Sequence, residues 1–228
     1  MATGWQNLEG IREVIDQGYS SLGYEAGGLG YRFLSSPEST LWSSKLILSI
    51  NPAGNRPDFE NDSMFTPDGV SGFVNERWLS APMGSSKLQI QYQAMFKYLG
   101  WDPLEVLQAP FSPYRYPSWS KLPSDLRSRT VQFCKNSIWK PYFDKHCPDK
   151  IVCVGKPQLD PLLDIIPAQI VGSELVPTGW NNRACDTASV YHFENGTVVV
   201  QIPHLSRFGI MTAPTCQSSL QNIFRPLM

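Results

Sequence analysis

The 228-residue sequence predicts a three-layer α/β/α domain with a mainly parallel central sheet of about four strands. Two observations lead to this prediction. Short aliphatic runs, typical of buried strands, alternate along the chain with longer segments of helical periodicity. Each aliphatic run also ends in an unusual loop, so these loops are expected to gather at the carboxyl edge of the sheet, where open α/β sheets bind ligands.

The amino-terminal part of the chain contributes one helix and the first strand. Residues 7–17 are expected to form a helix, because apolar residues recur there at helical spacing and Asn7 can cap its start. Residues 18–44 mix glycines, a proline and several serines, and they are expected to be irregular. Residues 46–50 form a short aliphatic run closed by turn residues, which predicts a buried strand.

A long segment rich in Pro, Gly, Asp and Asn follows this strand, over residues 55–86. A loop of that length inside a compact domain is more often functional than idle. Residues 88–99 then return to helical periodicity, with Gly100 as the stop signal. The large apolar side chains of the long segment must be buried or used on a ligand, and they are Phe59, Phe65, Phe73 and Trp78.

The rest of the chain continues the alternation. Ser124 is expected to cap a helix whose apolar positions, from Val131 to Tyr142, keep one face. Asn195-Gly196 between two apolar runs is a strong hairpin signal. No repeat or linker is visible, so a single domain over residues 1–228 is expected. The predicted elements are strands at 104–109, 150–155, 188–193 and 197–203, the helix after Ser124, and a closing helix at 217–224.

Composition and charge limit which functions are open to the protein. The net charge of -1 at pH 7 announces no nucleic-acid partner, so a DNA-binding face would have to be local. No apolar run approaches the ~20 residues of a membrane span and no secretion signal is visible, so we expect a cytoplasmic protein. The 5 cysteines are scattered without a C-x-x-C pair, which predicts reduced thiols and no zinc, iron–sulfur cluster or other cofactor. Cys134 and Cys153 are expected in the core.

Distinctive motifs stand at the ends of the predicted strands. They are Ser-Ile-Asn-Pro-Ala-Gly at residues 49–54, Pro-Tyr-Arg-Tyr-Pro at 113–117, Lys-Ile-Val-Cys-Val-Gly-Lys at 150–156 and His-Leu-Ser-Arg-Phe at 204–208. In this order they resemble motifs of the uracil-DNA glycosylase superfamily, the first in the Asn-Pro-Gly form of its mismatch-specific and single-strand-selective branches. The resemblance extends over about residues 45–210 and implies a uracil-DNA glycosylase-like fold.

The resemblance implies a monofunctional DNA glycosylase, which flips a nucleotide out of the helix, excises its base and leaves an abasic site. Asn51 and His204 would be catalytic. The Asn51 amide would hold a water facing the sugar, and His204 would hydrogen-bond the base oxygen on which negative charge develops. No lysine follows either motif in a place that suggests a Schiff-base nucleophile. The partner would be DNA, with no metal and no membrane, and the protein would act as a monomer.

The other site residues implied by the resemblance contact the base or the DNA. Phe65 would stack on the base, although Phe59 and Phe73 lie in the same segment. Phe208 would fill the stack that the base vacates, or else belong to the core. The remaining candidates are Pro52, Ala53 and Arg115 at the base, with an ion pair as the alternative for Arg115, and Ser206, Arg207 and Lys156 at the DNA backbone.

Departures from the family pattern bear on the substrate. The first motif lacks the Asp and Tyr of uracil-specific enzymes, and Leu205 replaces the usual Pro of the second. Where relatives place an Asn that reads the base edge, this chain has Gln108-Ala109-Pro110, and proline has no donor to offer. We therefore expect a uracil-like base or, more in keeping with these changes, a modified pyrimidine. Candidates are 5-hydroxymethylcytosine or its glucosylated form in phage DNA, which would make the protein an antiphage defence.

Two alternatives stand beside the glycosylase. The first is a non-catalytic nucleic-acid or modified-base binding module on the same fold, against which the presence of both Asn51 and His204 argues. The second is an unrelated α/β nucleotide enzyme with accidental motif matches. The chain has neither a Walker loop nor a G-x-G-x-x-G fingerprint, which places this second alternative last.

Overall fold

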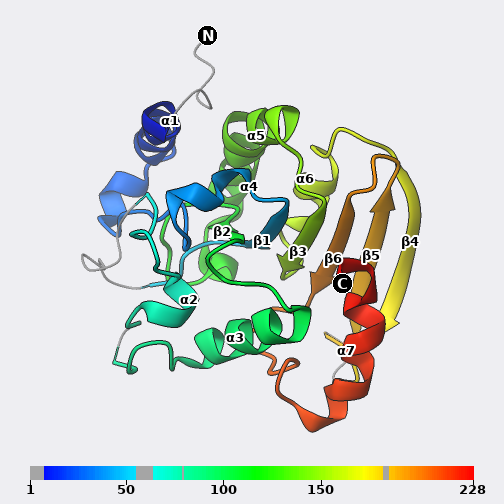
Figure 1. Ribbon diagram of the computed structural model, residues 1–228. Coiled ribbons are helices and arrows are strands. Elements are labelled where there is room, and N and C mark those ends of the chain that lie inside the picture. The colour runs from blue at the N-terminus through cyan, green and yellow to red at the C-terminus, as the bar shows by residue number, and fades with distance from the viewer. Residues whose placement is uncertain (1–7, 55–63, 79, 182–184) are drawn as a thin grey trace.

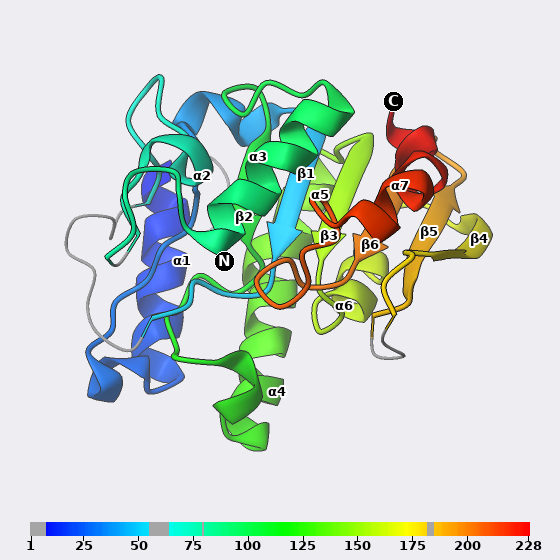
Figure 2. The same cartoon turned by 90° about the horizontal axis from the view of Figure 1, so that it is seen from below.

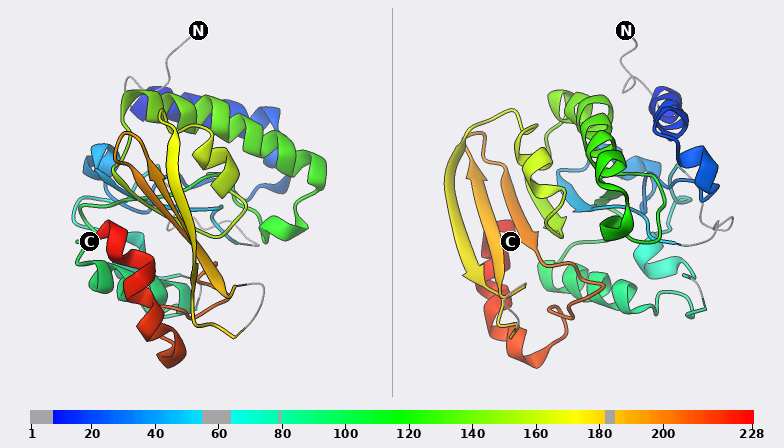
Figure 3. Two further views of the ribbon diagram at one scale, coloured as in Figure 1. Left: turned by 90° about the vertical axis from the view of Figure 1, so that its right-hand side faces the viewer. Right: turned by 180° about the vertical axis from the view of Figure 1, so that it is seen from behind.

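The computed structural model describes residues 8–54, 64–78, 80–181 and 185–228 (Figure 1). The predicted cap residue Asn7 and the loop residue Phe59 lie outside the described residues. One mixed sheet crosses the molecule with helices against both of its faces, so the prediction of an α/β fold is confirmed (Figures 1 and 3).

The sheet has six strands in the order β2-β1-β3-β6-β5-β4. The pairs β1–β2, β1–β3 and β3–β6 are parallel, whereas β5 and β4 extend the sheet in the antiparallel direction. The prediction of a mainly parallel sheet holds, but about four strands was too few. The strands are β1 (Lys45–Ser49), β2 (Leu107–Pro110), β3 (Lys150–Val154), β4 (Ile170–Pro177), β5 (Thr187–Phe193) and β6 (Val198–Ile202).

Two strands differ from the sequence prediction. β4 was missed because it contains Gly172, ends in Pro177 and is exposed over most of its length, so it shows no clear alternation of apolar and polar residues. β2 begins at Leu107 instead of residue 104. The N–H groups of Leu104 and Glu105 donate to the side chain and carbonyl of Asp102, which forms a turn before the strand.

Helices cover both faces of the sheet (Figure 3). Leu46 and Leu48 of β1 pack into the core under α1, α4, α5 and α6, while Ile47 packs into the core under α2, α3 and α7, as the alternation of side chains along a strand requires. The helices are α1 (Leu8–Ser21), α2 (Gly72–Asn75), α3 (Lys87–Leu99), α4 (Ser124–Phe133), α5 (Lys140–Lys145), α6 (Leu159–Leu163) and α7 (Gln217–Phe224).

The helix ends test the predicted start and stop signals. Gly100 ends α3 in the left-handed conformation with φ of 64°, as predicted. The same helix begins with a capping box between Ser86 and Gln89, which the sequence reading did not identify. Ser124 does not cap α4: Pro123 precedes the helix and Ser124 is its first residue.

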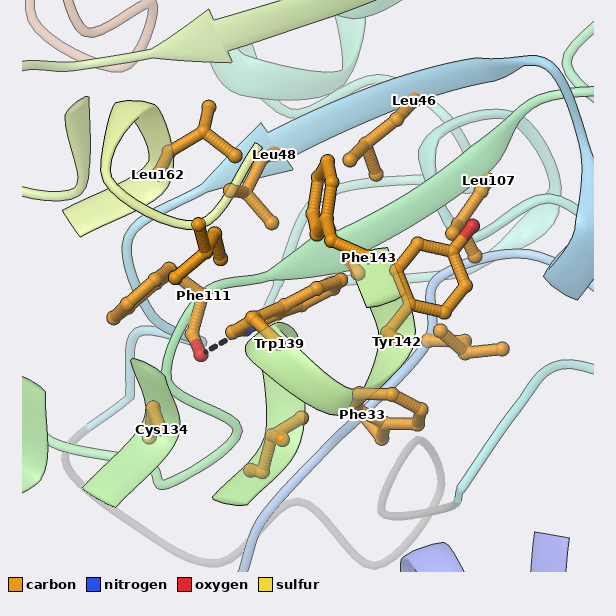
Figure 4. Packing of buried hydrophobic residues seen from close by; sticks show 14 of the residues in the cluster. Phe33, Leu46, Leu48, Leu107, Phe111, Cys134, Trp139, Tyr142, Phe143 and Leu162 are labelled. Carbon is orange, nitrogen blue, oxygen red and sulfur yellow. Dashed lines mark hydrogen bonds between the residues drawn. The ribbon is translucent and has the colours of Figure 1, made fainter. Parts of the chain in front are cut away.

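A π-helical turn, Cys134–Trp139, joins α4 to α5. Trp139 is fully buried, and its indole N–H donates to the carbonyl oxygen of Phe111 at 2.7 Å (Figure 4). Phe111 directly follows β2, so this bond ties the helical layer to a loop at the carboxyl edge of the sheet. Cys134 and Cys153 are both fully buried, which confirms the expectation that they belong to the core.

Candidate active site

A pocket of about 570 Å³ opens at the carboxyl ends of the parallel strands. The loops that follow β1, β2, β3 and β6 leave the sheet at this edge (Figure 2), and residues from all four line the pocket, as expected for an open α/β sheet. All the site residues predicted from the sequence except Phe65 line this pocket. They are Asn51, Pro52, Ala53, Arg115, Lys156, His204, Ser206, Arg207 and Phe208.

Phe65 does not join the other predicted residues, which corrects the expectation that it stacks on a base in this pocket. It lines a separate, smaller hollow beside Glu9 and Arg12. The residues on either side of Phe65 are hydrogen-bonded to the chain near residue 35. The Thr66 N–H donates to the Ser36 carbonyl at 3.2 Å, and the Leu34 N–H donates to the Met64 carbonyl at 2.8 Å.

Asn51 lies just after β1 and is half-buried. Its side-chain nitrogen donates to the carbonyl oxygens of Pro52 at 3.0 Å and Tyr116 at 3.4 Å. Both amide hydrogens are therefore engaged by the backbone, and the carboxamide oxygen is the group of this side chain that acts as an acceptor. This oxygen can accept a hydrogen bond from a water molecule.

His204 lies just after β6 and is held by Ser206. Its Nδ1 accepts hydrogen bonds from the Ser206 backbone N–H at 3.2 Å and from the Ser206 hydroxyl at 2.8 Å. Because a backbone N–H can only donate, Nδ1 carries no proton in this arrangement, and the neutral ring bears its hydrogen on Nε2. Ser206 thus orients the imidazole, a contact that the sequence reading did not foresee.

The protonation of His204 follows from its surroundings. Burial lowers the pKa of His204 below its usual value of 6.5, and the positive charge of Arg207 lowers it further. The imidazole is therefore neutral at pH 7, which agrees with the bonds that Nδ1 accepts. The loop after β3 comes close here: a side chain at Gly155, whose φ is 103°, would lie 3.4 Å from the His204 ring.

The charged groups around the pocket are all positive among the described lining residues: Arg32, Arg77, Arg115, Lys156 and Arg207. Arg32 is neutralised by Glu76 in a buried ion pair at 2.6 Å. Lys156 and Arg207 add positive charge at the pocket, although the whole chain carries a net charge of -1.

Arg115 braces the first-motif loop. Its side chain donates from Nη1 to the carbonyl oxygen of Ala53 at 3.1 Å, and its backbone N–H donates to Gly30. The residue is only 6% exposed. Its guanidinium therefore fixes the backbone next to Asn51 at the same time as it lines the pocket.

The opposite wall is apolar and comes from α2, α3 and the chain between them. Phe73 and Tyr92 stack face to face, with ring centroids 3.7 Å apart, and Trp78 meets the edge of Phe73 at 5.1 Å. The Trp78 indole N–H donates to Glu76, which also binds Arg32. Sequence reasoning named Phe73 and Trp78 as candidates for a ligand, but it assigned Tyr92 to the core face of its helix and did not single out Arg32 or Trp119, which also lines the pocket.

The loop after β6 is anchored by Gln91 of α3. The side chain of Gln91 donates to the Thr212 hydroxyl at 2.6 Å and accepts from the Met211 N–H at 3.0 Å. Within the same loop, Phe208 is half-buried, packs against the core and meets Trp180 edge-on at 6.1 Å. Phe208 thus contacts the core and also lines the pocket.

The end of β2 presents no polar side chain to the pocket. Pro110 is the residue that lines it there, as the sequence indicated. Gln108 is fully buried away from the pocket, where its oxygen accepts from the Ser71 hydroxyl at 2.9 Å and its nitrogen donates to Pro103 and Val106.

Comparison with protein-family models and with curated proteins finds no match for this chain. Within the described ranges, no helix is long and apolar enough to cross a membrane. The same residues contain no group of three or more His, Cys, Asp or Glu side chains placed to hold a metal ion. The function must therefore be argued from the pocket itself.

Proposed function

We propose that the protein is a DNA glycosylase, which hydrolyses the bond between a flipped-out pyrimidine base and its deoxyribose. One observation carries the proposal: the Asn51 carboxamide and the neutral His204 imidazole, from strands on either side of β3, line the same basic pocket. An amide that can hold a water and a neutral donor that can meet a developing anion are the two groups this hydrolysis needs.

In the proposed reaction the Asn51 oxygen holds a water molecule against the anomeric carbon of the sugar. The water oxygen bonds to that carbon, and the carbon–nitrogen bond breaks with its electron pair passing to the base. The Nε2–H of His204 donates to the base oxygen on which this charge collects, and the proton lost by the water neutralises the base. Because the imidazole is held by Ser206, its donor needs no reorientation.

The groups around this pair suit a DNA substrate. Lys156 lies on the loop after β3 and Arg207 on the loop that carries His204, and both line the pocket, where they can contact phosphates beside the flipped nucleotide. Phe208 can enter the vacated base stack, supported from behind by its edge contact with Trp180. The apolar wall of Phe73 and Trp78 offers faces on which a planar base can stack.

The pocket has room for a pyrimidine larger than uracil. A volume of about 570 Å³ lies within the range of roughly 300–1,000 Å³ that accommodates whole drug-sized ligands, so a base with a bulky substituent has room. Pro110 lines the pocket at the end of β2, and the motif resemblance would place the uracil-reading Asn of the glycosylases at this strand end. We therefore propose a modified pyrimidine such as 5-hydroxymethylcytosine or its glucosylated form, with defence against phages as the corresponding role.

The test is base release from labelled oligonucleotides that contain uracil, 5-hydroxymethyluracil, 5-hydroxymethylcytosine or glucosylated 5-hydroxymethylcytosine. Abasic sites are detected by alkaline cleavage. Release of one base by the natural protein, lost in both Asn51→Ala and His204→Ala but kept in His192→Ala, would establish the activity and name the substrate. His192 is a matched control because it lies on β5 and is not among the residues lining the pocket.

The second candidate is a binding module for DNA or modified bases, favoured by the basic lining and the aromatic wall. It predicts base-dependent DNA binding without release of any base from the panel. Free release of uracil with none of the modified bases would instead remove the proposal of a modified pyrimidine and keep the glycosylase.

A further inference from the structure

A pocket that selects one base must present polar groups to the edge of that base, and the end of β2 presents none. Pro110 has no donor, and Gln108 is occupied by contacts outside the pocket. The next two backbone N–H groups are also engaged, since Phe111 donates to the Ser49 carbonyl at 2.8 Å and Ser112 donates to the Ile50 carbonyl at 2.9 Å. Recognition of the base edge must therefore come from another part of the wall.

Ser49 and Tyr92 bring two hydroxyl groups together at that place. Ser49 is the last residue of β1, and its side chain points to the same face as Ile47, towards α3. Tyr92 projects from α3, and the Ser49 side chain lies near enough to influence its hydroxyl. Both residues line the pocket. Tyr92 is only 1% exposed, so its side chain is buried where it borders the pocket.

The position of the Tyr92 hydroxyl is fixed by its ring. Phe73 covers one face of the ring in a nearly parallel stack of 3°. Burial raises the pKa of Tyr92 above its usual value of 10, more than Ser49 lowers it, so the hydroxyl keeps its hydrogen at every pH at which the protein would act. A hydroxyl on a ring held by such a stack has little freedom to lose when a ligand binds.

We infer that the Ser49 and Tyr92 hydroxyls together form the element that reads the polar edge of the base. Each of the two hydroxyls has a hydrogen to donate and lone pairs to accept. The pair can therefore match an exocyclic amino group or a carbonyl oxygen of a pyrimidine. This inference rests on the proposed function, and it makes Ser49 and Tyr92 determinants of specificity that act beside the catalytic pair.

The test compares Tyr92→Phe and Ser49→Ala with the natural protein in single-turnover base release. Tyr92→Phe removes one oxygen and keeps the stacked ring. We expect kcat/KM for the preferred base to fall about 10- to 100-fold, and the preference over a base that differs in one exocyclic amino or carbonyl group to shrink by a similar factor. If the two residues had a purely structural role, kcat/KM would fall equally for both bases and the ratio of the two values would stay unchanged.

Tyr98→Phe is the matched control, because Tyr98 lies on the same helix and contacts Phe224 outside the pocket. It is expected to change neither rate nor preference. Equilibrium binding of free uracil, cytosine and 5-hydroxymethylcytosine to the same proteins, measured by calorimetry, provides a readout that needs no catalysis.

The outcomes separate the two proposals. Base release by the natural protein with an unchanged ratio in both Tyr92→Phe and Ser49→Ala would overturn the inference and leave the glycosylase standing. Binding of a free base that weakens in these variants, without release of any base, would support the reading element and overturn the glycosylase. If the natural protein neither releases nor binds a base, both proposals fall.

Discussion

The two walls of the pocket are held in place by different means. The wall that carries Asn51 and His204 is built from strand ends and fixed by backbone hydrogen bonds, such as those from Phe111 to Ser49 and from Gly155 to Ile202, with added side-chain bonds made by Arg115 and Gln91. The apolar wall is fixed by side chains. Gln89 donates to the carbonyl oxygens of Gly72 and Glu76, and Gln93 donates to those of Phe73 and Gly84.

This difference predicts different costs of substitution. Backbone bonds survive the loss of a side chain, so the strand-end wall can carry reactive groups whose removal affects chemistry and not folding. The side-chain bonds of the apolar wall are buried, and a substitution there leaves unsatisfied partners behind. Chemistry and stability are thus expected to separate between the two walls.

The largest expected effect on stability is at Glu76, which holds the apolar wall. Glu76→Ala leaves Arg32 buried, with a side chain 5% exposed, and removes the acceptor of the Trp78 indole. We expect the free energy of unfolding, measured by urea denaturation, to fall by about 3–5 kcal/mol. The control is Glu105→Ala, whose ion pair with Lys45 spans 3.9 Å at the surface and should contribute about 1 kcal/mol or less. Equal losses in the two variants would refute this account of the wall.

On the other wall, His204→Ala should slow base release and leave the stability of the protein nearly unchanged. Loss of the donor to the departing base is expected to slow base release by about 10²–10³-fold. The midpoint of thermal unfolding should change little, because the ring is half-buried and its partner Ser206 is exposed. A variant that unfolds several degrees earlier would show that the histidine is structural.

Gln91→Ala is expected to have an intermediate effect, since this residue joins the two walls. It leaves the buried Met211 N–H without its acceptor, which should lower the free energy of unfolding by about 1–3 kcal/mol. Hydrogen exchange should become faster in the loop after β6 and stay unchanged in α7. Exchange that speeds up evenly over the whole protein would contradict a local anchor.

The smallest expected effect concerns the pKa of His204. Burial is the main cause of its low value and Arg207 the second, so Arg207→Ala should raise this pKa by a fraction of the total shift. Because the histidine binds a proton less readily in the folded protein than in the unfolded one, stability falls as the pH drops from 6.5 towards the folded pKa.

The pKa of His204 can be measured directly by NMR titration of the imidazole signals, with His204→Gln used to assign the resonance. In Arg207→Ala the folded pKa of His204 should lie closer to 6.5, so the pH range over which this histidine lowers the stability should become narrower. An unchanged pKa would mean that burial alone sets the protonation of His204.

The strand-end wall was predictable from the sequence, and the apolar wall was predictable only in part. Asn51 and His204 were placed together because parallel strands deliver their carboxyl ends to one edge. Sequence spacing cannot show which aromatic residue of a long irregular segment turns towards the pocket. Phe65 was therefore predicted to stack on the base, whereas Phe73 is the phenylalanine of this segment that lines the pocket. Tyr92 was not predicted as a site residue, because its helical spacing places it on the core face of α3. A residue on that face can also line a cavity, as Tyr92 does.

The π-helical turn at Cys134–Trp139 has a consequence for changes in chain length. Each α-helical residue turns the helix by about 100°, so deleting one residue from this turn would rotate everything after it by that angle. The Trp139 indole would then no longer point at the Phe111 carbonyl. The residue count of this helix is therefore geometrically coupled to the loop that leads to Arg115, and an insertion or deletion in one is expected to require a compensating change in the other.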